Sequence, residues 1–209
     1  MSTYNGEKYI EEQLKSILAQ INVDVKILVR DDGSKDNTLS IIRAYQKKYS
    51  NIEIVEGDNS GACGSFFELI KRADETIEYT AFCDQDDVWK ENKLISAIEM
   101  VEKERTDIPV LYCGNYELVD EKLMPIGYTE NRERPELSFG NALIECNCTG
   151  CTAVINTCLL HMIKKNIPQK AYMHDMWLYL VASAFGKVYY DKNAYILYRQ
   201  HAQNTIGVK

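Results

Sequence analysis

The sequence lacks the long apolar runs, basic clusters and flexible linkers of membrane-spanning, nucleic-acid-binding or multidomain proteins. Its longest apolar candidate, residues 178–186, is nine residues long, whereas a membrane-spanning helix needs roughly 18. Acidic residues outnumber basic ones by 31 to 24, and no run of Lys or Arg offsets the net charge of −7, so nucleic acid is not an expected partner. With only four prolines and no Gly/Ser-rich stretch among 209 residues, we expect a single domain over 1–209.

Two common nucleotide-binding signatures are also missing. No Gly-rich run ends in Gly-Lys-Ser/Thr, which counts against a P-loop NTPase. No GxGxxG follows a predicted strand, which counts against a dinucleotide-dependent dehydrogenase. The composition itself, 45% hydrophobic and 26% charged, is that of an ordinary globular protein and excludes a low-complexity or disordered chain.

The seven cysteines do not resemble a disulfide framework. Their number is odd, and Met1 leads into a polar segment rather than an apolar leader, so we expect a reduced, cytoplasmic location. Cys146, Cys148 and Cys151 are close in sequence and could hold zinc or an iron–sulfur cluster, with Cys158 or His161 as the fourth ligand. Free cysteine usually packs as a small hydrophobe, so buried thiols are the favoured interpretation.

Apolar residues alternate between helical and extended spacing along the chain. In the first half they predict helices over 7–20, 38–49, 65–73 and 91–104, and strands over 23–30, 52–55 and 79–83. This order predicts an α/β fold with a mostly parallel sheet and helices on both faces. The second half predicts strands over 110–119, 151–156, 187–191 and 195–199, helices up to residue 165 and over 174–185, and an irregular segment over 120–136.

The first residues are unusual for such a fold. The segment Ser2–Gly6 has the composition of a loop that follows a first β-strand, yet no strand precedes it in the sequence. Two interpretations stay open. Either about five to ten further residues, the usual length of a strand, complete the fold at this end, or the fold begins with the helix over 7–20.

Polar motifs follow three of the predicted strands. They are Arg30 to Ser34, Asn59 to Gly61, and the acidic run Asp84, Asp86 and Asp87. Singly, each could be a turn or a helix cap. Ligands of parallel α/β sheets bind at the carboxyl ends of the strands, and several carboxylates at one edge need a cation or hydrogen-bond donors to offset their repulsion. The acidic run suits Mg²⁺ or Mn²⁺, and such a metal would help a bridged diphosphate to leave.

In this order and spacing the motifs resemble a family 2 inverting glycosyltransferase of the GT-A fold. The segments that carry the resemblance span nearly the whole chain: 2–6, 29–34, 59–61, 82–89 and 174–175. The Asp-Gln-Asp-Asp-x-Trp form, the His-Asp-x-Trp segment and Tyr198-Arg199-Gln200-His201-x-x-Asn204 resemble, more narrowly, bacterial rhamnosyltransferases of polysaccharide synthesis.

The resemblance implies a nucleotide site made of seven residues. Thr3 and Tyr4 would line the base pocket, Asp31 and Asp32 would accept from the pyrimidine imide, Asn59 and Gly61 would approach the nucleotide, and Asp84 would bind the ribose. Two features depart from the family pattern: the first strand is missing or truncated, and Arg30 stands where the family usually has an apolar residue.

The resemblance also implies the metal and the base. Asp86 would ligate a divalent metal, Mg²⁺ or Mn²⁺, and His201 falls where some members close a C-terminal segment onto the diphosphate or metal. Asp175 matches the catalytic base. Its alternative interpretation is an N-cap aspartate of the helix over 174–185.

The implied activity is transfer of a sugar, rhamnose being one option, from a UDP- or dTDP-linked donor to a hydroxyl of a saccharide or lipid-linked saccharide, with inversion. Residues 1–105 would bind the nucleotide and residues 106–209 the acceptor. A lipid-linked acceptor would bring the enzyme to the cytoplasmic face of the inner membrane as a peripheral protein. A non-catalytic or truncated nucleotide-sugar-binding module is the alternative.

Overall fold

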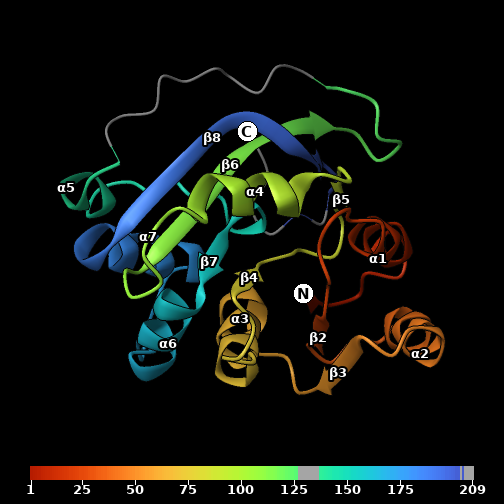
Figure 1. The fold of residues 1–209 in the computed structure, drawn as a ribbon. Helices are drawn as coiled ribbons and strands as arrows, with labels where there is room; N and C mark the ends of the chain where they lie inside the picture. Colours follow the sequence, from red (N-terminus) through yellow and green to blue (C-terminus); the bar gives the residue numbers. More distant parts are fainter. Residues whose placement is uncertain (127–136, 203, 205–209) are drawn as a thin grey trace.

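The first half of the chain builds a small parallel sheet. The structure, a computed structural model, describes residues 1–126, 137–202 and 204 (Figure 1). Strands β1 (Ser2–Thr3), β2 (Ile27–Asp31) and β3 (Ile52–Glu56) lie side by side in the order β1-β2-β3, and both pairs are parallel. Leu28 of β2 is half-buried and its other residues are all buried, the pattern expected of a strand covered on both faces.

The second sheet has five strands in the order β4-β7-β6-β8-β5. These are β4 (Tyr79–Ala81), β7 (Val154–Asn156), β6 (Val110–Val119), β8 (Lys187–Arg199) and β5 (Val88–Trp89). The long strands β6 and β8 run parallel to each other, and the remaining pairs are antiparallel. The predicted α/β class is therefore confirmed, with an all-parallel first sheet and a mixed second sheet.

Helices cover both faces of the second sheet, as predicted. Alternate residues of β6 point to opposite sides. Leu111 and Cys113 belong to the cluster with α6 (Thr157–Lys165) and α7 (His174–Phe185), whereas Val110 and Tyr112 pack with α4 (Lys93–Val101). A short helix, α5 (Phe139–Ala142), lies beside α7.

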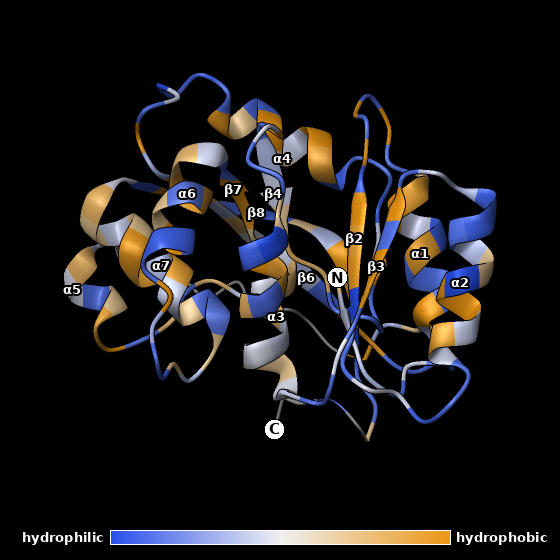
Figure 2. Cartoon of the chain, turned by 90° about the horizontal axis from the view of Figure 1, so that it is seen from below, coloured by the Kyte–Doolittle hydropathy of each residue, from blue (hydrophilic) through white to orange (hydrophobic). Residues whose placement is uncertain are grey.

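Three helices enclose the first sheet. Figure 2 shows the apolar strands β2 and β3 between α3 (Gly61–Arg72) on one side and α1 (Ile10–Leu18) and α2 (Thr38–Lys48) on the other. Ile10, Leu14 and Ile17 follow one another at helical spacing and are buried against this sheet. Within the described residues, no helix combines the length and the apolar content needed to cross a bilayer.

Three sequence expectations differ from the structure. The strands expected over 187–191 and 195–199 are one continuous strand, β8, whose pairing with β6 continues through register shifts at Gly114/Asn115 and Asn115/Glu117. The strand expected over 151–156 is shortened by a 3₁₀ turn, η1 (Gly150–Thr152). Helix α3 begins at Gly61, whose φ of 72° places it at a sharp entry that glycine tolerates. Of the irregular segment 120–136, residues 127–136 lie outside the described residues.

Candidate active site

Most of the predicted site residues line one cavity. This cavity, of about 620 Å³, lies where the carboxyl ends of β1, β2 and β4 approach the loop before η1 and the start of α7. The predicted residues among those that line it are Thr3, Tyr4, Asp32, Asn59, Gly61, Asp84, Asp86 and Asp175. Asp31 and His201 do not line it. Asp31 accepts hydrogen bonds from Ser34, and His201 contacts Asp86, which lines the cavity.

Gln85 organises the wall that holds Thr3 and Tyr4. Its Oε1 accepts hydrogen bonds from Thr3 Oγ1 and from the Tyr4 amide, both at 2.8 Å, and its Nε2 donates to the Tyr4 carbonyl at 3.0 Å. A Cβ on Gly6 would lie 2.2 Å from the same Oε1, so a larger residue at this position would displace the Gln85 side chain. The Tyr4 side chain is 45% exposed, which leaves its ring free to stack on a planar ligand. The sequence analysis missed Gln85.

Asp32 is held by the start of α3 and by Arg30. Its oxygens accept from the amides of Ser60 and Gly61 at 2.9–3.0 Å. Arg30 is buried, pairs with Asp32 and donates to the Asp58 carbonyl at 2.9 Å. Burial alone would raise the pKa of Asp32, but the hydrogen bonds from Arg30 and Ser60 lower it below its ordinary value. The charge of Arg30, which the sequence places beside the pocket, is thus neutralised by Asp32, which lines the pocket.

Asp31 is engaged locally. Its carboxylate accepts from the Ser34 amide at 3.0 Å and from Ser34 Oγ at 2.6 Å, and its side chain is buried. These bonds close the turn at Gly33, where φ is 81° and a Cβ would lie 3.3 Å from the Gly57 carbonyl. In this structure Asp31 shapes the loop beside the cavity rather than the cavity surface.

The acidic run after β4 concentrates negative charge. Burial, followed by the charges of Asp86 and Asp175, raises the pKa of Asp84 to about 7. Burial also raises the pKa of Asp87 well above its ordinary value, and its Oδ1 accepts from the Arg199 amide at 3.2 Å. Several carboxylates that disfavour one another's ionisation are the expected property of an acidic site that binds a cation.

Asp86 contacts the C-terminal segment directly. Its Oδ2 lies 2.8 Å from His201 Nε2, so the predicted pair of metal ligands is adjacent. Arg199 is 2% exposed and anchors the loop that carries Asp86. It donates to the carbonyls of Asp86 at 2.8 Å and Glu121 at 2.6 Å, and to the Glu12 carboxylate at 2.5 Å. The Asp86 carboxylate and the His201 imidazole are oxygen and nitrogen donors of the kind that Mg²⁺ or Mn²⁺ accepts.

Asp175 is a half-buried carboxylate at the opposite wall. It is the second residue of α7, whose N-cap is Met173, so the N-cap interpretation of Asp175 is wrong. Its Oδ2 accepts from the Gly150 amide at 3.0 Å and its Oδ1 from the Met176 amide at 2.8 Å. Burial raises its pKa, and the two amides lower it in part. An ionisable carboxylate with a raised pKa at a cavity wall suits a general base.

His174 lies beside Asp175 and is buried. Its ring stacks on Phe66 with centroids 3.9 Å apart, and neither ring nitrogen has a hydrogen-bond partner among the described residues. Burial lowers its pKa to about 3, so it is neutral at physiological pH. A Cβ on Gly150 would lie 2.9 Å from its Nε2, which explains why η1 begins with glycine.

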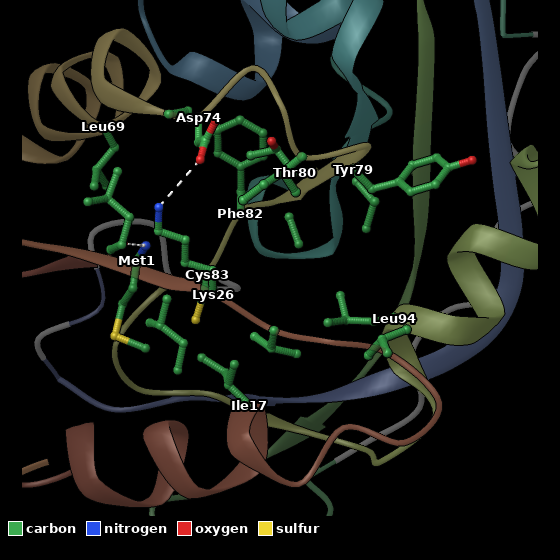
Figure 3. A pocket seen from close by; sticks show the side chains of 18 of the residues that line it. Met1, Ile17, Lys26, Leu69, Asp74, Tyr79, Thr80, Phe82, Cys83 and Leu94 are labelled. Atoms are coloured by element: carbon green, nitrogen blue, oxygen red, sulfur yellow. Dashed lines mark hydrogen bonds and ion pairs between the residues drawn. The ribbon is translucent and has the colours of Figure 1, made fainter. Parts of the chain in front are cut away.

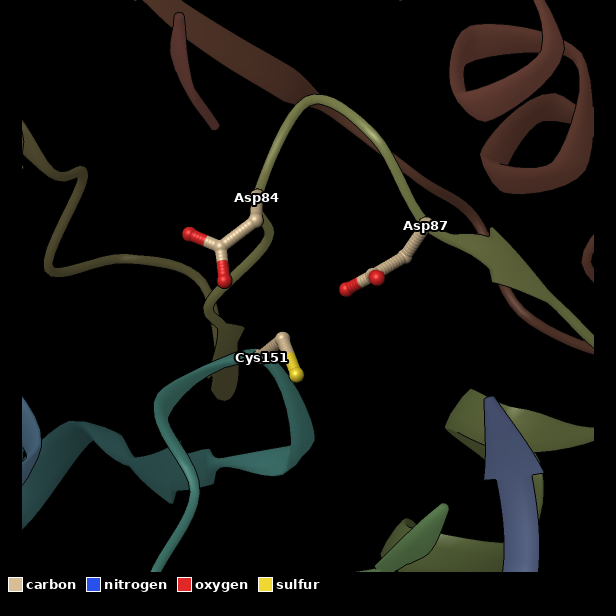
Figure 4. Close-up of side chains that lie close together, drawn as sticks. All are labelled: Asp84, Asp87 and Cys151. Carbon is tan, nitrogen blue, oxygen red and sulfur yellow. The ribbon is translucent and has the colours of Figure 1, made fainter. Parts of the chain in front are cut away.

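Within the 146–151 group, Cys151 packs apart from Cys146 and Cys148. Cys148 packs in the cluster with α6 and α7, Cys151 packs in the cluster with α1, and Cys146 is half-buried. His161 contacts Glu75 instead of a cysteine. Cys151 lies behind the acidic run with Asp84 and Asp87, with one ligand atom from each within 4.8 Å of the others (Figure 4). Burial raises the pKa of the Cys151 thiol well above its ordinary range, which disfavours the thiolate that a metal needs.

Comparison with known families decides the classification. Residues 1–160 match the model of Glycosyl transferase family 2. The chain belongs to this family. It is therefore a glycosyltransferase, as the motifs predicted, and the cavity described above is its candidate active site.

The relatives support both the family and the fold. The chain is 36% identical over 224 aligned positions to the dTDP-rhamnosyl transferase RfbG of Shigella flexneri, covering 99% of this chain and 73% of that protein. It resembles S. aureus TarS in complex with UDP-GlcNAc (TM-score 0.73, 23% identity, covering 97% and 58%) and the mannosyltransferase PcManGT from Pyrobaculum calidifontis in complex with GDP-Man and Mn²⁺ (0.72, 18%, 97% and 56%). The GT-A fold is confirmed. The chain spans less than three fifths of both solved structures.

Proposed function

We propose that the chain transfers a deoxyhexose, with inversion, from a dTDP-linked donor to a hydroxyl of a growing bacterial surface polysaccharide or its lipid-linked precursor. The observation that carries this proposal is that one cavity is lined both by Asp84 and Asp86 of the acidic run and by Asp175. The choice of donor is supported by the dTDP-rhamnosyl transferase relative. UDP-linked sugars are the alternative donors, in line with the ligand named for TarS.

Each wall of the cavity has a role in this proposal. Tyr4 and Thr3, held by Gln85, face the pyrimidine, and Asp32 with Asn59 and Gly61 borders the nucleotide. Asp31 acts indirectly, through the turn at Gly33. Residues 1–105 hold the donor, and the later residues that line the cavity, from 146 to 176, receive the acceptor.

Asp86 and His201 are the proposed ligands of a divalent cation, Mg²⁺ or Mn²⁺, and Asp84 is the proposed contact of the ribose. When bound, the cation would neutralise the charge that develops on the leaving diphosphate. The chain's own part is to hold the Asp86 carboxylate and the His201 imidazole 2.8 Å apart, and Arg199 keeps the loop that carries Asp86 in place from the protein interior.

Asp175 is the proposed base. Inverting transfer is one displacement at the anomeric carbon, and the acceptor hydroxyl must lose its proton as the bond forms. The Gly150 and Met176 amides orient the Asp175 carboxylate, and burial raises its proton affinity. The proton moves from the acceptor hydroxyl to a carboxylate oxygen of Asp175 as the diphosphate departs.

A donor panel tests the proposal. The purified chain is heated with Mn²⁺ and with dTDP-rhamnose, UDP-glucose, UDP-GlcNAc or GDP-mannose, and the anomeric configuration of any product is read by NMR. A ligand at 100 times its Kd stabilises by about 2.7 kcal/mol, so dTDP-rhamnose should raise the melting temperature most. Preference for GDP-mannose, or a retained configuration, would contradict the proposal. Donor binding without turnover on any saccharide acceptor would favour the binding-module alternative.

A further inference from the structure

His174 is a buried polar side chain whose hydrogen-bonding capacity is unused. Its ring packs against Phe66 and Phe82, with ring centroids 3.9 Å and 5.3 Å away, and neither ring nitrogen has a partner among the described residues. A neutral imidazole has one nitrogen that donates and one that accepts. Burying such atoms without a hydrogen bond costs stability, so packing against aromatic rings does not explain why a histidine stands here.

The two sides of His174 differ in character. Phe66 and Phe82, on one side, also border a cavity of about 510 Å³ near β2 and β4, where apolar side chains such as Leu69 and Leu94 gather (Figure 3). On its other side His174 belongs to the wall of the active-site cavity. The active-site cavity is therefore the side from which a ligand can supply the missing hydrogen bond.

Gly150 leaves a bare surface beside His174 and the proposed base. A Cβ on Gly150 would lie 2.9 Å from His174 Nε2 and 3.3 Å from Asp175 Oδ2. Both polar atoms therefore border the same side-chain-free face of Gly150, a residue that itself lines the cavity. Two atoms in this arrangement can bond two neighbouring hydroxyls of one molecule. Because Asp175 is the proposed base, that molecule is the acceptor.

Tyr172 adds an aromatic surface to the same wall. Its side chain is 81% exposed and lines the cavity. Met173, which separates it from His174, has extended backbone angles of φ −147° and ψ 156°, so the side chains of Tyr172 and His174 project to the same side of the chain. An exposed ring near a hydrogen-bonding group suits a ligand with an apolar face and polar edges. A pyranose has this shape, since its C–H groups form a face and its hydroxyls lie around the rim.

We propose that Tyr172 and His174 form the acceptor subsite and select a pyranose that carries a free hydroxyl next to the reacting one. The apolar face of the sugar stacks on Tyr172. The neighbouring hydroxyl bonds to the His174 imidazole across the bare face of Gly150, while the reacting hydroxyl contacts Asp175. This assignment rests on the proposed function, because it takes Asp175 as the base. Tyr172 and His174 bind and orient the acceptor, and the proton still moves to Asp175.

The first test uses the wild-type chain and defined acceptors. With dTDP and Mn²⁺ present, binding of the methyl pyranosides of rhamnose, glucose and N-acetylglucosamine is measured by saturation-transfer difference NMR. Transfer from dTDP-rhamnose then identifies the reacting hydroxyl. The monodeoxy acceptor that lacks the neighbouring hydroxyl should lose about ten-fold or more in kcat/KM, since a site built to bond a hydroxyl rejects the analogue without it. An equally reactive deoxy acceptor, or normal dTDP binding without binding of any glycoside, would overturn the subsite.

His174→Phe separates hydrogen bonding from packing. The variant keeps an aromatic ring against Phe66 and removes both nitrogens, so its melting temperature should be no lower than that of wild type. Its kcat/KM for the parent acceptor should nevertheless fall about ten-fold, and removing the neighbouring hydroxyl from the acceptor should cause no further loss. Unchanged kcat/KM would show that His174 only packs. If this variant does not fold, the deoxy comparison on the wild-type chain decides.

Tyr172→Ala tests the aromatic surface. It should raise the KM of the acceptor about ten-fold without changing donor affinity, and Tyr172→Phe, which keeps the ring, should raise it less. Phe185→Ala is the control, because Phe185 is a 68% exposed aromatic that does not line the cavity, and its KM should stay within about two-fold of wild type. A wild-type KM in Tyr172→Ala would remove Tyr172 from the subsite.

The outcomes distinguish this assignment from the proposed function. Glycosides that bind in a manner dependent on Tyr172 and His174, but receive no sugar from any donor, would contradict the transferase and leave the subsite standing. Sugar transfer that neither His174→Phe nor Tyr172→Ala affects would support the transferase and overturn the subsite.

Discussion

Replacing Asp175 with Asn separates its proposed chemistry from its structural bonds. The substitution keeps the shape of the side chain but removes its negative charge and its ability to accept a proton. Asn can still accept from either the Gly150 or the Met176 amide, whereas Asp175 accepts from both. The variant therefore loses the base and one backbone hydrogen bond, and little else.

The structure predicts a large kinetic effect and a small effect on stability. A lost hydrogen bond costs about 1 kcal/mol, and removing a charge that burial disfavours offsets part of this. The melting temperature should change by less than about 4 °C. Turnover should fall by about 100-fold or more, the usual contribution of a general base, which equals about 2.7 kcal/mol in the activation free energy.

The pH dependence gives a second, independent readout. Burial raises the pKa of Asp175, and only its ionised form accepts a proton, so wild-type turnover should fall as pH drops through a midpoint above the ordinary value of about 3.9. The raised folded-state pKa also means that ionisation costs stability. That cost is absent below the unfolded-state pKa, grows as pH rises toward the folded-state pKa and is constant above it. Asp175→Asn should therefore gain stability relative to wild type as pH rises between these two pKa values.

The assay measures the initial rate of sugar transfer from the donor that the panel selects. Melting curves and donor affinity are measured alongside. Asp36→Asn is the matched control. Asp36 also accepts from two backbone amides near the start of a helix, those of Glu7 and Thr38 at 3.0 Å, but it does not line the cavity, so turnover should stay within about two-fold of wild type. Near-normal turnover of Asp175→Asn, or an unchanged acidic limb, would remove Asp175 from the mechanism.

Three further substitutions probe the surroundings of the site. Asp86→Ala should abolish transfer and the Mn²⁺-dependent part of nucleotide affinity while the fold survives; full activity in excess chelator would contradict the metal assignment. Gly150→Ala places a methyl group 2.9 Å from His174 and 3.3 Å from the Asp175 Oδ2, so turnover should drop at least ten-fold, whereas Gly140→Ala, with only Ser138 Oγ at 3.9 Å, should behave as wild type. Arg199→Met removes three side-chain hydrogen bonds of a buried cation and should lower the free energy of unfolding by about 3 kcal/mol in chemical denaturation; a change below about 1 kcal/mol would contradict the anchoring role.

The first half of the fold was predictable because local signals and tertiary contacts agree there. Strands β2 and β3 are short apolar runs followed by turn residues, and parallel strands bring those turns to one edge. That rule placed Asp32, Asn59 and Asp84 in one cavity. The direction of strands in the second sheet was not predictable, since periodicity reports which residues are buried and not which neighbour a strand pairs with.

The residues that sequence analysis missed act through contacts between distant segments. Gln85 bonds to residues 81 and 82 positions away, and nothing near it in sequence indicates that role. Arg30 was read as a charge beside the pocket, yet residues two apart in a strand share a face, and that spacing pairs it with Asp32. The alternative interpretation of Asp175 as an N-cap is wrong because α7 begins one residue before it. Helix boundaries are the least certain part of a sequence-based prediction.

The Arg199 anchor has a consequence for biosynthesis. The loop that carries Asp86 is complete in sequence long before Arg199, which lies 113 residues further along, leaves the ribosome. Chains fold from the N-terminus as they are synthesised, so the first sheet and helix α1 can form while the acidic run still lacks its buried guanidinium partner and the neighbouring His201. The cation site should therefore be among the last parts of the protein to mature, and a nascent chain stalled before β8 should bind a nucleotide base more readily than a divalent metal.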